Sequence, residues 1–255
     1  MCQLISSQLD IDRIDYLKRD SFYSGAAEGN INSERIITML NVKDNNLVIE
    51  EKGIYSVEKF LIARRLMYWQ VYLHKTSLVA EQLLIRVLKR AKELTSEGED
   101  LNCSKALKYF LKNPISFKNF TQEVLKEYAK LDDSDIISAM KEWQCHGDYV
   151  LKQLCKMIIN RNLLRIELSK NKINTSLLDK HIESLVKKDK ISRDEAKYFV
   201  FSGEISNQAY QVNYQSINIF YKTGDIEDIV EASDQLNLRA LSKPVSKYYI
   251  CYPKD

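Results

Sequence analysis

The sequence predicts a mainly α-helical protein that carries a β hairpin and a small C-terminal α+β part. Only 7 glycines and 3 prolines occur among the 255 residues, and both residue types are unfavourable inside helices. Apolar residues recur at helical spacing up to about residue 190, and aromatic, β-branched runs typical of strands follow. We therefore predict a helical domain at residues 1–190, with a long central helix and a helical extension, and a small α+β region at residues 191–255.

Two helices are predicted in the first 40 residues. Residues 9–24 have helical periodicity that ends near Gly25, a residue suited to a helix C-terminus. A short amphipathic helix at residues 32–40 follows, and Ser33 is its expected N-cap.

A β hairpin is predicted at residues 46–55. Two apolar runs flank Glu50-Glu-Lys-Gly53, where the glycine would supply the turn. From Ser56 to about Leu94 the apolar pattern predicts one long helix.

Further helices are predicted before residue 190, at residues 103–112, 117–130, 133–145, 148–160 and 174–188. The strands of the C-terminal part are predicted at Tyr198–Glu204, Ile217–Tyr221 and Lys247–Tyr252, where aromatic and β-branched residues alternate with few charges. A helix at residues 225–233 separates the last two.

The composition limits the classes of function. A formal net charge of +3 is too small to indicate nucleic-acid binding. The five cysteines are scattered without a CxxC pair, which argues against a zinc site and indicates reduced thiols. Apolar runs of transmembrane length and a signal-peptide core are both absent from the sequence. We therefore expect a cytoplasmic protein with neither a membrane nor a nucleic acid as partner.

The segment Ser6-Ser-Gln-Leu-Asp-Ile-Asp-Arg-Ile-Asp-Tyr-Leu-Lys-Arg-Asp20 concentrates carboxylates and cations on a predicted helix. Asp12, Tyr16 and Asp20 are spaced i, i+4 and i+8, so they share one face. Carboxylates and a phenol beside basic residues suit a metal and a phosphorylated ligand. A solvated, charge-rich face is the alternative interpretation.

A second polar stripe lies on the long predicted helix. Arg64, Tyr68, Tyr72 and Lys75 fall at i, i+4, i+8 and i+11, so cation, phenol, phenol and cation follow one another. The stripe is polar and aromatic although apolar residues flank it on the helix, so we do not expect it to face only the protein core. We predict that this stripe and the Asp12 face form two walls of one cleft.

The first segment closely resembles the last motif of the HD-domain phosphohydrolases, in the branch that hydrolyses deoxynucleoside triphosphates. That branch writes it Ser-Ser-x-Leu-Asp-x-Asp-Arg-x-Asp-Tyr-Leu-x-Arg-Asp-Ser, followed by aromatics and glycine, as here in Ser21-Phe-Tyr-Ser-Gly25. The resemblance extends over nearly the whole chain, through the long helix at 57–75, the segment Ile159-Asn-Arg-Asn-Leu-Leu-Arg165 and the tail at 241–253.

The resemblance implies an HD-domain-type helical core and a set of site residues. Asp12 would be the distal metal-binding carboxylate. The substrate-binding residues would be Arg13, Tyr16, Asp20, Arg64, Tyr68 and Tyr72. Among these, Arg13 and Arg64 would contact phosphates, and Tyr72 would exclude a 2′-hydroxyl from the sugar position. Some relatives have histidine in place of Tyr68.

The resemblance also implies a homo-oligomer and a second set of nucleotide-binding residues. His74, Lys75, Arg161 and Arg165 are similar to positions that bind activating nucleotides at subunit contacts in some relatives. The alternative is that these residues are ordinary surface cations.

The motifs that name this family are not found in the sequence. The family holds its metal with a histidine, a later His-Asp pair and the distal aspartate, whereas here neither His74, His146 nor His181 is followed by aspartate. We therefore expect the chain to be the C-terminal part of a longer enzyme, or the product of an internal start. The ion of the complete enzyme would be manganese, iron, magnesium or zinc, and one carboxylate would not retain it here.

The resemblance predicts that the complete enzyme hydrolyses deoxynucleoside triphosphates such as dGTP to deoxynucleoside and triphosphate, by metal-assisted attack of water. The isolated chain is expected to be inactive. A non-catalytic helical module that binds nucleotides, regulates or oligomerises is the competing interpretation, and the absent histidine motifs favour it for this chain alone.

Overall fold

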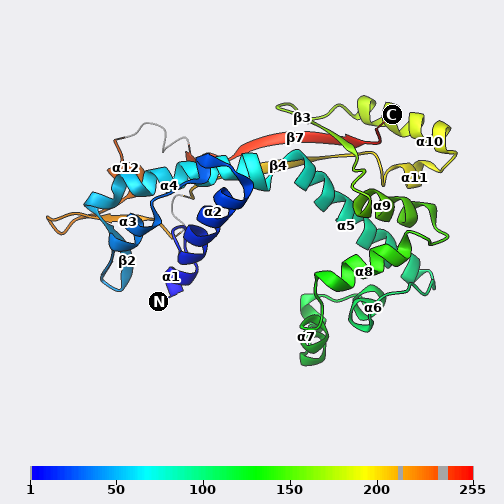
Figure 1. Cartoon of the computed structure of the whole chain (residues 1–255), viewed down its shortest axis with the longest axis horizontal. Helices are drawn as coiled ribbons and strands as arrows, with labels where there is room; N and C mark the ends of the chain where they lie inside the picture. Colours follow the sequence, from blue (N-terminus) through cyan, green and yellow to red (C-terminus); the bar gives the residue numbers. More distant parts are fainter. Residues whose placement is uncertain (1, 212–214, 235–240, 255) are drawn as a thin grey trace. The chain divides into compact units, whose positions relative to one another are not determined.

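The chain folds into two compact units that interleave along the sequence (Figure 1). The computed structural model describes residues 2–211, 215–234 and 241–254. Unit 1 contains residues 1–74 and 204–247, and unit 2 contains residues 75–203 and 248–255. This division differs from the predicted boundary at residue 190, because the C-terminal segment supplies strands to both units.

The N-terminal part of unit 1 is helical. Its elements are α1 (Cys2–Ile5), α2 (Ile11–Ser24), the 3₁₀ turn η1 (Ala27–Gly29) and α3 (Ser33–Thr38). Helix α2 begins where the Asp10 carboxylate accepts the Arg13 N–H at 2.7 Å and ends at Gly25, which has a φ of 72°. The predicted end is thus confirmed. Asn32, and not Ser33, caps α3.

The hairpin is present, but the predicted position of its turn is wrong. Strands β1 (Leu40–Lys43) and β2 (Asn46–Glu50) are joined at Asp44 and Asn45, with φ values of 50° and 60°. Positive φ at both positions is the geometry of a two-residue type I′ hairpin loop, and Asp and Asn tolerate it. Gly53 instead ends the 3₁₀ turn η2 (Glu51–Gly53), which leads into the next helix.

The long helix predicted from residue 56 to 94 is interrupted. Helix α4 (Ile54–Met67) continues into a π-helical turn, η3 (Tyr68–Tyr72), and two residues separate this turn from α5 (Lys75–Ser96). The Leu73 N–H donates to the Tyr68 carbonyl at 2.7 Å, an i→i+5 bond that identifies the π turn. The stripe predicted from Arg64 to Lys75 therefore does not continue on one helix to Lys75.

A four-stranded sheet in unit 1 joins distant parts of the sequence. Its order is β1-β2-β5-β6, with β5 (Asn218–Phe220) parallel to β2 and β6 (Ile226–Asp228) antiparallel to β5. The short helix α12 (Ile229–Ala232) follows, so only the second half of the helix predicted at 225–233 is helical. Fully buried side chains of α4, such as Phe60 and Leu61, lie in the core of this unit.

Unit 2 is built on α5, which packs against α9. The elements that follow α5 are α6 (Lys105–Lys112), η4 (Phe117–Asn119), α7 (Gln122–Tyr128), α8 (Asp133–Trp143), α9 (Tyr149–Ile159), β3 (Arg165–Ser169), α10 (Thr175–Asp189), α11 (Arg193–Ala196), β4 (Phe201–Asn207) and β7 (Val245–Tyr252). The last strand lies between the other two in a sheet of order β3-β7-β4. No helix within the described residues has the length and apolar character needed to cross a bilayer.

A substitution at Gly29 would test how tightly the residues around α4 are packed. A Cβ atom at this position would lie 2.5 Å from Met67 Sδ and 2.8 Å from Ser21 Cβ. Gly29→Ala is therefore expected to lower the free energy of unfolding by about 1–3 kcal/mol, the usual cost of overpacking. Urea denaturation of the whole chain measures the loss. Gly147→Ala is the control, because its Cβ would meet no atom within 4 Å; equal losses in both variants would contradict the packing argument.

Candidate functional site

Tyr16 and Asp20, from one of the two predicted walls, contact Tyr72 of the other inside unit 1. Tyr72 Oη donates to Asp20 Oδ2 at 2.8 Å. The Tyr72 ring also contacts Tyr16 and Tyr68 edge-to-face, with centroid distances of 5.9 and 5.2 Å. Arg64 Cζ lies 5.9 Å from the centroid of the Tyr68 ring. We call these five residues, Tyr16, Asp20, Arg64, Tyr68 and Tyr72, the polar-aromatic cluster.

Two local structures position the cluster. Tyr16 and Asp20 are one helical turn apart on α2, so both project from the same face. Tyr68 and Tyr72 are the first and last residues of the π turn. The wider turn changes the direction of these side chains relative to a regular helix, and π turns are frequent at functional sites.

The phenols of Tyr16 and Tyr72 stay protonated at neutral pH. Burial, followed by the hydrogen bond to Asp20 and its negative charge, raises the pKa of Tyr72 far above the ordinary value. Burial and the neighbouring Tyr68 also raise the pKa of Tyr16, although the Arg64 cation opposes them. Both tyrosines can therefore act as hydrogen-bond donors and as rigid apolar walls, but not as bases.

Arg64 keeps part of its donor capacity. Its Nη1 donates to the Ala209 carbonyl oxygen at 3.0 Å, which fixes the side chain against the segment after β4. Its Nε is buried and has no hydrogen-bond partner in the ranges that the structure describes. A guanidinium held in this way can offer further N–H groups to an anion.

Asp12 and Arg13 lie at the start of α2, outside these ring contacts. The Asp12 side chain is exposed in the first helical turn. Arg13, expected to bind phosphates, forms an ion pair with the Asp10 carboxylate and donates to the Ser7 carbonyl oxygen. Asp10 was not among the predicted site residues, because the helix was predicted to begin at residue 9, which placed Asp10 inside it and not at its N-cap.

The described residues do not fit a catalytic divalent ion. Within them, no group of three or more His, Cys, Asp or Glu side chains could hold a metal. Asp12 would provide a single oxygen ligand, whereas such ions require several. No chemical step can therefore be derived through a metal bound by this chain alone.

The four residues predicted to bind activating nucleotides are distributed over both units. His74 is exposed at the end of unit 1, and Lys75 opens α5 in unit 2. Arg161, at a φ of 55°, follows α9. Arg165 begins β3, where its Nε lies 3.3 Å from Glu167 Oε1. Their exposure is compatible both with nucleotide binding and with ordinary surface cations.

Two sequence comparisons match this chain. Residues 31–109 match the family model described as "HD associated region". The Bacillus subtilis protein YwfO is 31% identical over 261 residues, which cover 99% of this chain and 57% of YwfO. The chain thus spans little more than half the length of this relative.

A solved structure and a named enzyme are also similar. The crystal structure of a phosphohydrolase from Bacteroides thetaiotaomicron is 50% identical with a TM-score of 0.92, over 99% of this chain and 63% of that one. The deoxynucleoside triphosphate triphosphohydrolase SAMHD1 homolog of Dictyostelium discoideum is 22% identical over 159 residues, which cover 62% of this chain and 26% of that protein.

Proposed function

We propose that this chain, for which the comparisons support an HD-domain phosphohydrolase family, is the C-terminal portion of a metal-dependent enzyme. The substrate proposed is a deoxynucleoside triphosphate such as dGTP, and the products are deoxynucleoside and triphosphate. The observation that carries the proposal is the 2.8 Å hydrogen bond between Tyr72 and Asp20. It joins two polar walls whose residue types match those of that family's substrate pocket.

The cluster suits a deoxyribose beside phosphates. Because Asp20 fixes the Tyr72 hydroxyl and Tyr16 packs against its ring, the phenol cannot swing aside to admit a 2′-hydroxyl. A rigid wall of this kind rejects ribose sterically. Arg64, held by the Ala209 carbonyl oxygen through Nη1, would contact a phosphate through its remaining Nη group, and its positive charge would stabilise negative charge that develops in the transition state.

The metal of the complete enzyme would bind Asp12 together with ligands from a segment outside the printed sequence. When bound, such an ion polarises a phosphoryl oxygen and lowers the pKa of its water. Manganese, iron, magnesium and zinc all accept an oxygen ligand of this type. The isolated 255-residue chain is proposed to be inactive, because Asp12 is a single ligand.

Regulation and assembly complete the proposal. His74, Lys75, Arg161 and Arg165 would bind activating nucleotides where subunits of a homo-oligomer meet. Arg161 and Arg165 are exposed on unit 2 and are therefore accessible to a ligand.

A non-catalytic module that binds nucleotides or partners is the second candidate. The observation that favours it is the lack of a metal-binding group among the residues described. Under this alternative, the polar-aromatic cluster would hold a nucleotide without cleaving it.

The deciding experiment compares two proteins, the 255-residue chain and the same chain extended upstream by a segment that supplies the His and His-Asp ligands. Both are incubated with dGTP or GTP, and the products are separated chromatographically. The extended protein is expected to release deoxyguanosine and triphosphate from dGTP, with little turnover of GTP, while the shorter chain stays at background. Release of pyrophosphate, or rapid turnover by the shorter chain, would overturn the proposal. Binding of dGTP without cleavage by both proteins would favour the second candidate.

A further inference from the structure

Unit 2 contains a groove between one face of α5 and the segment 192–198, which we call the α5 groove. Its volume is about 670 Å³, within the range of small-molecule sites. The charged and aromatic residues that line it include Arg86, Lys89, Arg90, Glu93, Glu195 and Tyr198. All belong to unit 2, whereas the polar-aromatic cluster belongs to unit 1.

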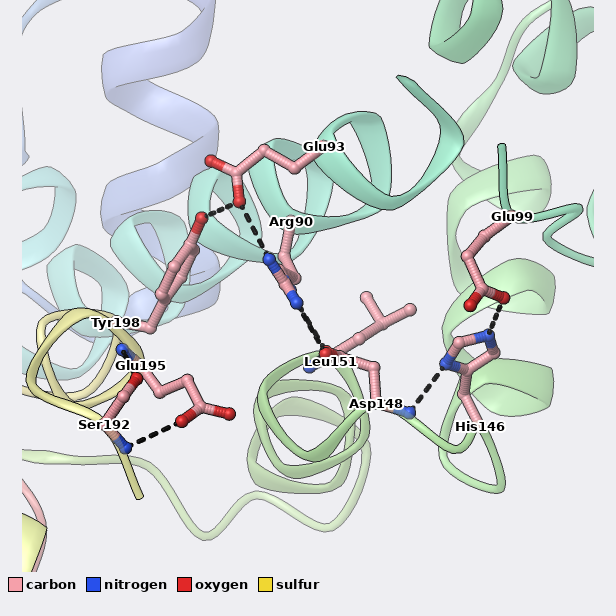
Figure 2. Close-up of polar contacts among 9 residues, drawn as sticks. All are labelled: Arg90, Glu93, Glu99, His146, Asp148, Leu151, Ser192, Glu195 and Tyr198. Atoms are coloured by element: carbon pink, nitrogen blue, oxygen red, sulfur yellow. Dashed lines mark hydrogen bonds and ion pairs between the residues drawn. The ribbon is translucent and has the colours of Figure 1, made fainter. Parts of the chain in front are cut away.

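Arg90 and Glu93 form ion pairs and hydrogen bonds within unit 2 (Figure 2). Arg90 Nη2 and Nε lie 2.7 and 3.2 Å from the two oxygens of Asp148, and Nη1 lies 3.3 Å from Glu93 Oε2. The Tyr198 hydroxyl donates to the same Glu93 oxygen. This chain of contacts ties α5 to α9 and to the segment after α11.

The remaining carboxylates of the groove also have partners. Glu195 Oε2 accepts the Ser192 N–H at 2.7 Å in the capping box of α11 (Figure 2). Asp194 Oδ1 lies 2.7 Å from Lys197 Nζ at the rim.

Arg86 and Lys89 differ from these groups. Arg86 Nη1 donates only to neutral acceptors, the carbonyl and side-chain oxygens of Gln82, both at 3.1 Å. Its guanidinium lies over the Phe201 ring, with Cζ 3.2 Å from the centroid. Lys89 Nζ lies 5.8 Å from the centroid of the Tyr198 ring. Among the described residues, neither cation has a carboxylate within ion-pair distance.

This arrangement presents two positive charges to one open space. Residues 86 and 89 are three apart on α5, so their side chains are neighbours on the same face. Burial lowers the pKa of the Arg86 guanidinium, but an arginine remains charged at neutral pH. The Phe201 ring holds the guanidinium of Arg86 by a cation–π contact, which leaves the N–H donors of the guanidinium free of the ring.

We propose that the α5 groove binds a phosphate or polyphosphate group, held by Arg86 and Lys89. A planar guanidinium forms two parallel hydrogen bonds to phosphate oxygens, and an ammonium supplies a mobile second charge. The bound group could be inorganic or part of a nucleotide, since both present the same oxygens. The proposal does not depend on the activity proposed above.

Isothermal titration of the 255-residue chain tests the inference with phosphate, pyrophosphate, tripolyphosphate and dGTP at millimolar concentrations. Binding is expected to strengthen from phosphate to tripolyphosphate. Arg86→Gln and Lys89→Gln should each weaken it by about tenfold or more, the usual effect of losing a hydrogen bond to a charged group. If dGTP binds more tightly than tripolyphosphate and is equally sensitive to Lys89→Gln, the ligand is a nucleotide; the reverse order assigns an inorganic polyphosphate.

Lys92→Gln is the matched control, because Lys92 is an exposed lysine of α5 that does not line the groove. This variant should bind as the unaltered chain does. Because Arg86 packs on Phe201, its replacement could affect folding, so thermal unfolding of each variant is measured beside the titrations. If Arg86→Gln does not fold, the titration of Lys89→Gln alone tests the proposal. No binding by any polyphosphate, or equal weakening by Lys89→Gln and Lys92→Gln, would overturn the proposal.

Discussion

Asp12→Asn in a protein extended upstream is expected to reduce dGTP hydrolysis by about a thousandfold or more, because metal polarisation supplies several kcal/mol of transition-state stabilisation. Asn keeps the size of the side chain but removes the negative charge that attracts the ion. Asp12 is exposed on α2, so its replacement should leave folding intact. Product release measures the rate, and elemental analysis should show a parallel loss of bound metal.

Asp15→Asn is the control for that experiment. Asp15 lies on the same helix, and its carboxylate pairs with Arg19 at 2.7 Å on the surface. An exposed pair of this kind contributes little, so activity and metal content should stay near those of the unaltered protein. Normal turnover by the Asp12 variant would remove Asp12 from the proposed metal site.

Asp148→Ala is expected to lower the free energy of unfolding by about 3 kcal/mol, because removing one partner of a largely buried ion pair leaves the other charge uncompensated. The Asp148 and Arg90 side chains are only 13% and 19% exposed. Asp148 Oδ1 also accepts the Leu151 N–H at 2.7 Å and so caps α9. The variant loses both contacts, and urea denaturation at neutral pH measures the total.

Asp132→Ala separates the contribution of a helix N-cap from that of the ion pair with Arg90. Asp132 caps α8 through the N–H groups of Ser134 and Asp135, so its loss should cost only about 1 kcal/mol. A loss as small in Asp148→Ala would mean that the contact with Arg90 contributes nothing measurable.

The Asp148 effect should depend on pH. Burial by itself raises the pKa of this carboxyl group, but hydrogen bonds from Arg90 and from the Leu151 N–H hold it below the ordinary value. A group whose pKa is lower in the folded state stabilises the fold above its unfolded pKa of about 3.9 and loses that contribution as the pH falls through the folded value. The difference between the unaltered chain and Asp148→Asn should therefore be largest at neutral pH and shrink below about pH 4.

Helix positions were predictable where short-range signals decide them. The predicted end at Gly25 agrees with the structure because a left-handed residue stops the helix there. The helix predicted at 148–160 is α9, whose N-cap is Asp148 itself. Each of these signals lies within four residues of the helix end that it determines, so the local sequence is sufficient to predict that end.

Other features depend on competing turn signals in the sequence or on residues that are distant along the chain. The predicted position of the hairpin is wrong because glycine is the stronger turn signal in the sequence and points to Gly53, whereas Asp44 and Asn45 adopt the positive φ values of the loop. Strand β3 was not predicted, although Leu164, Ile166 and Leu168 alternate with polar residues. This run is a short signal, and the strand is completed by pairing with β7, where Arg165 lies opposite Tyr252. The π turn keeps the apolar spacing of a helix, so periodicity cannot reveal it.

The candidate site was predictable only in part. Helical spacing places Tyr16 with Asp20, and Tyr68 with Tyr72, but no local pattern states that the two pairs are in contact. The ion pair between Arg13 and Asp10 was missed although the two residues are three apart, because the helix was predicted to begin at residue 9 and Asp10 was not recognised as its N-cap.

The interleaved units have a consequence for synthesis on the ribosome. Strand β2 near residue 48 must wait for β5 near residue 218 before the sheet of unit 1 can form. At ordinary elongation rates that delay is on the order of ten seconds. Residues 75–203 of unit 2 emerge in the meantime and can pack α5 against α9 first. Helices α2, α3 and α4 can contact one another during this interval, but α4 gains its contact with α12 only after residue 232 has been made. The core of unit 1 is therefore completed after most of unit 2 has emerged.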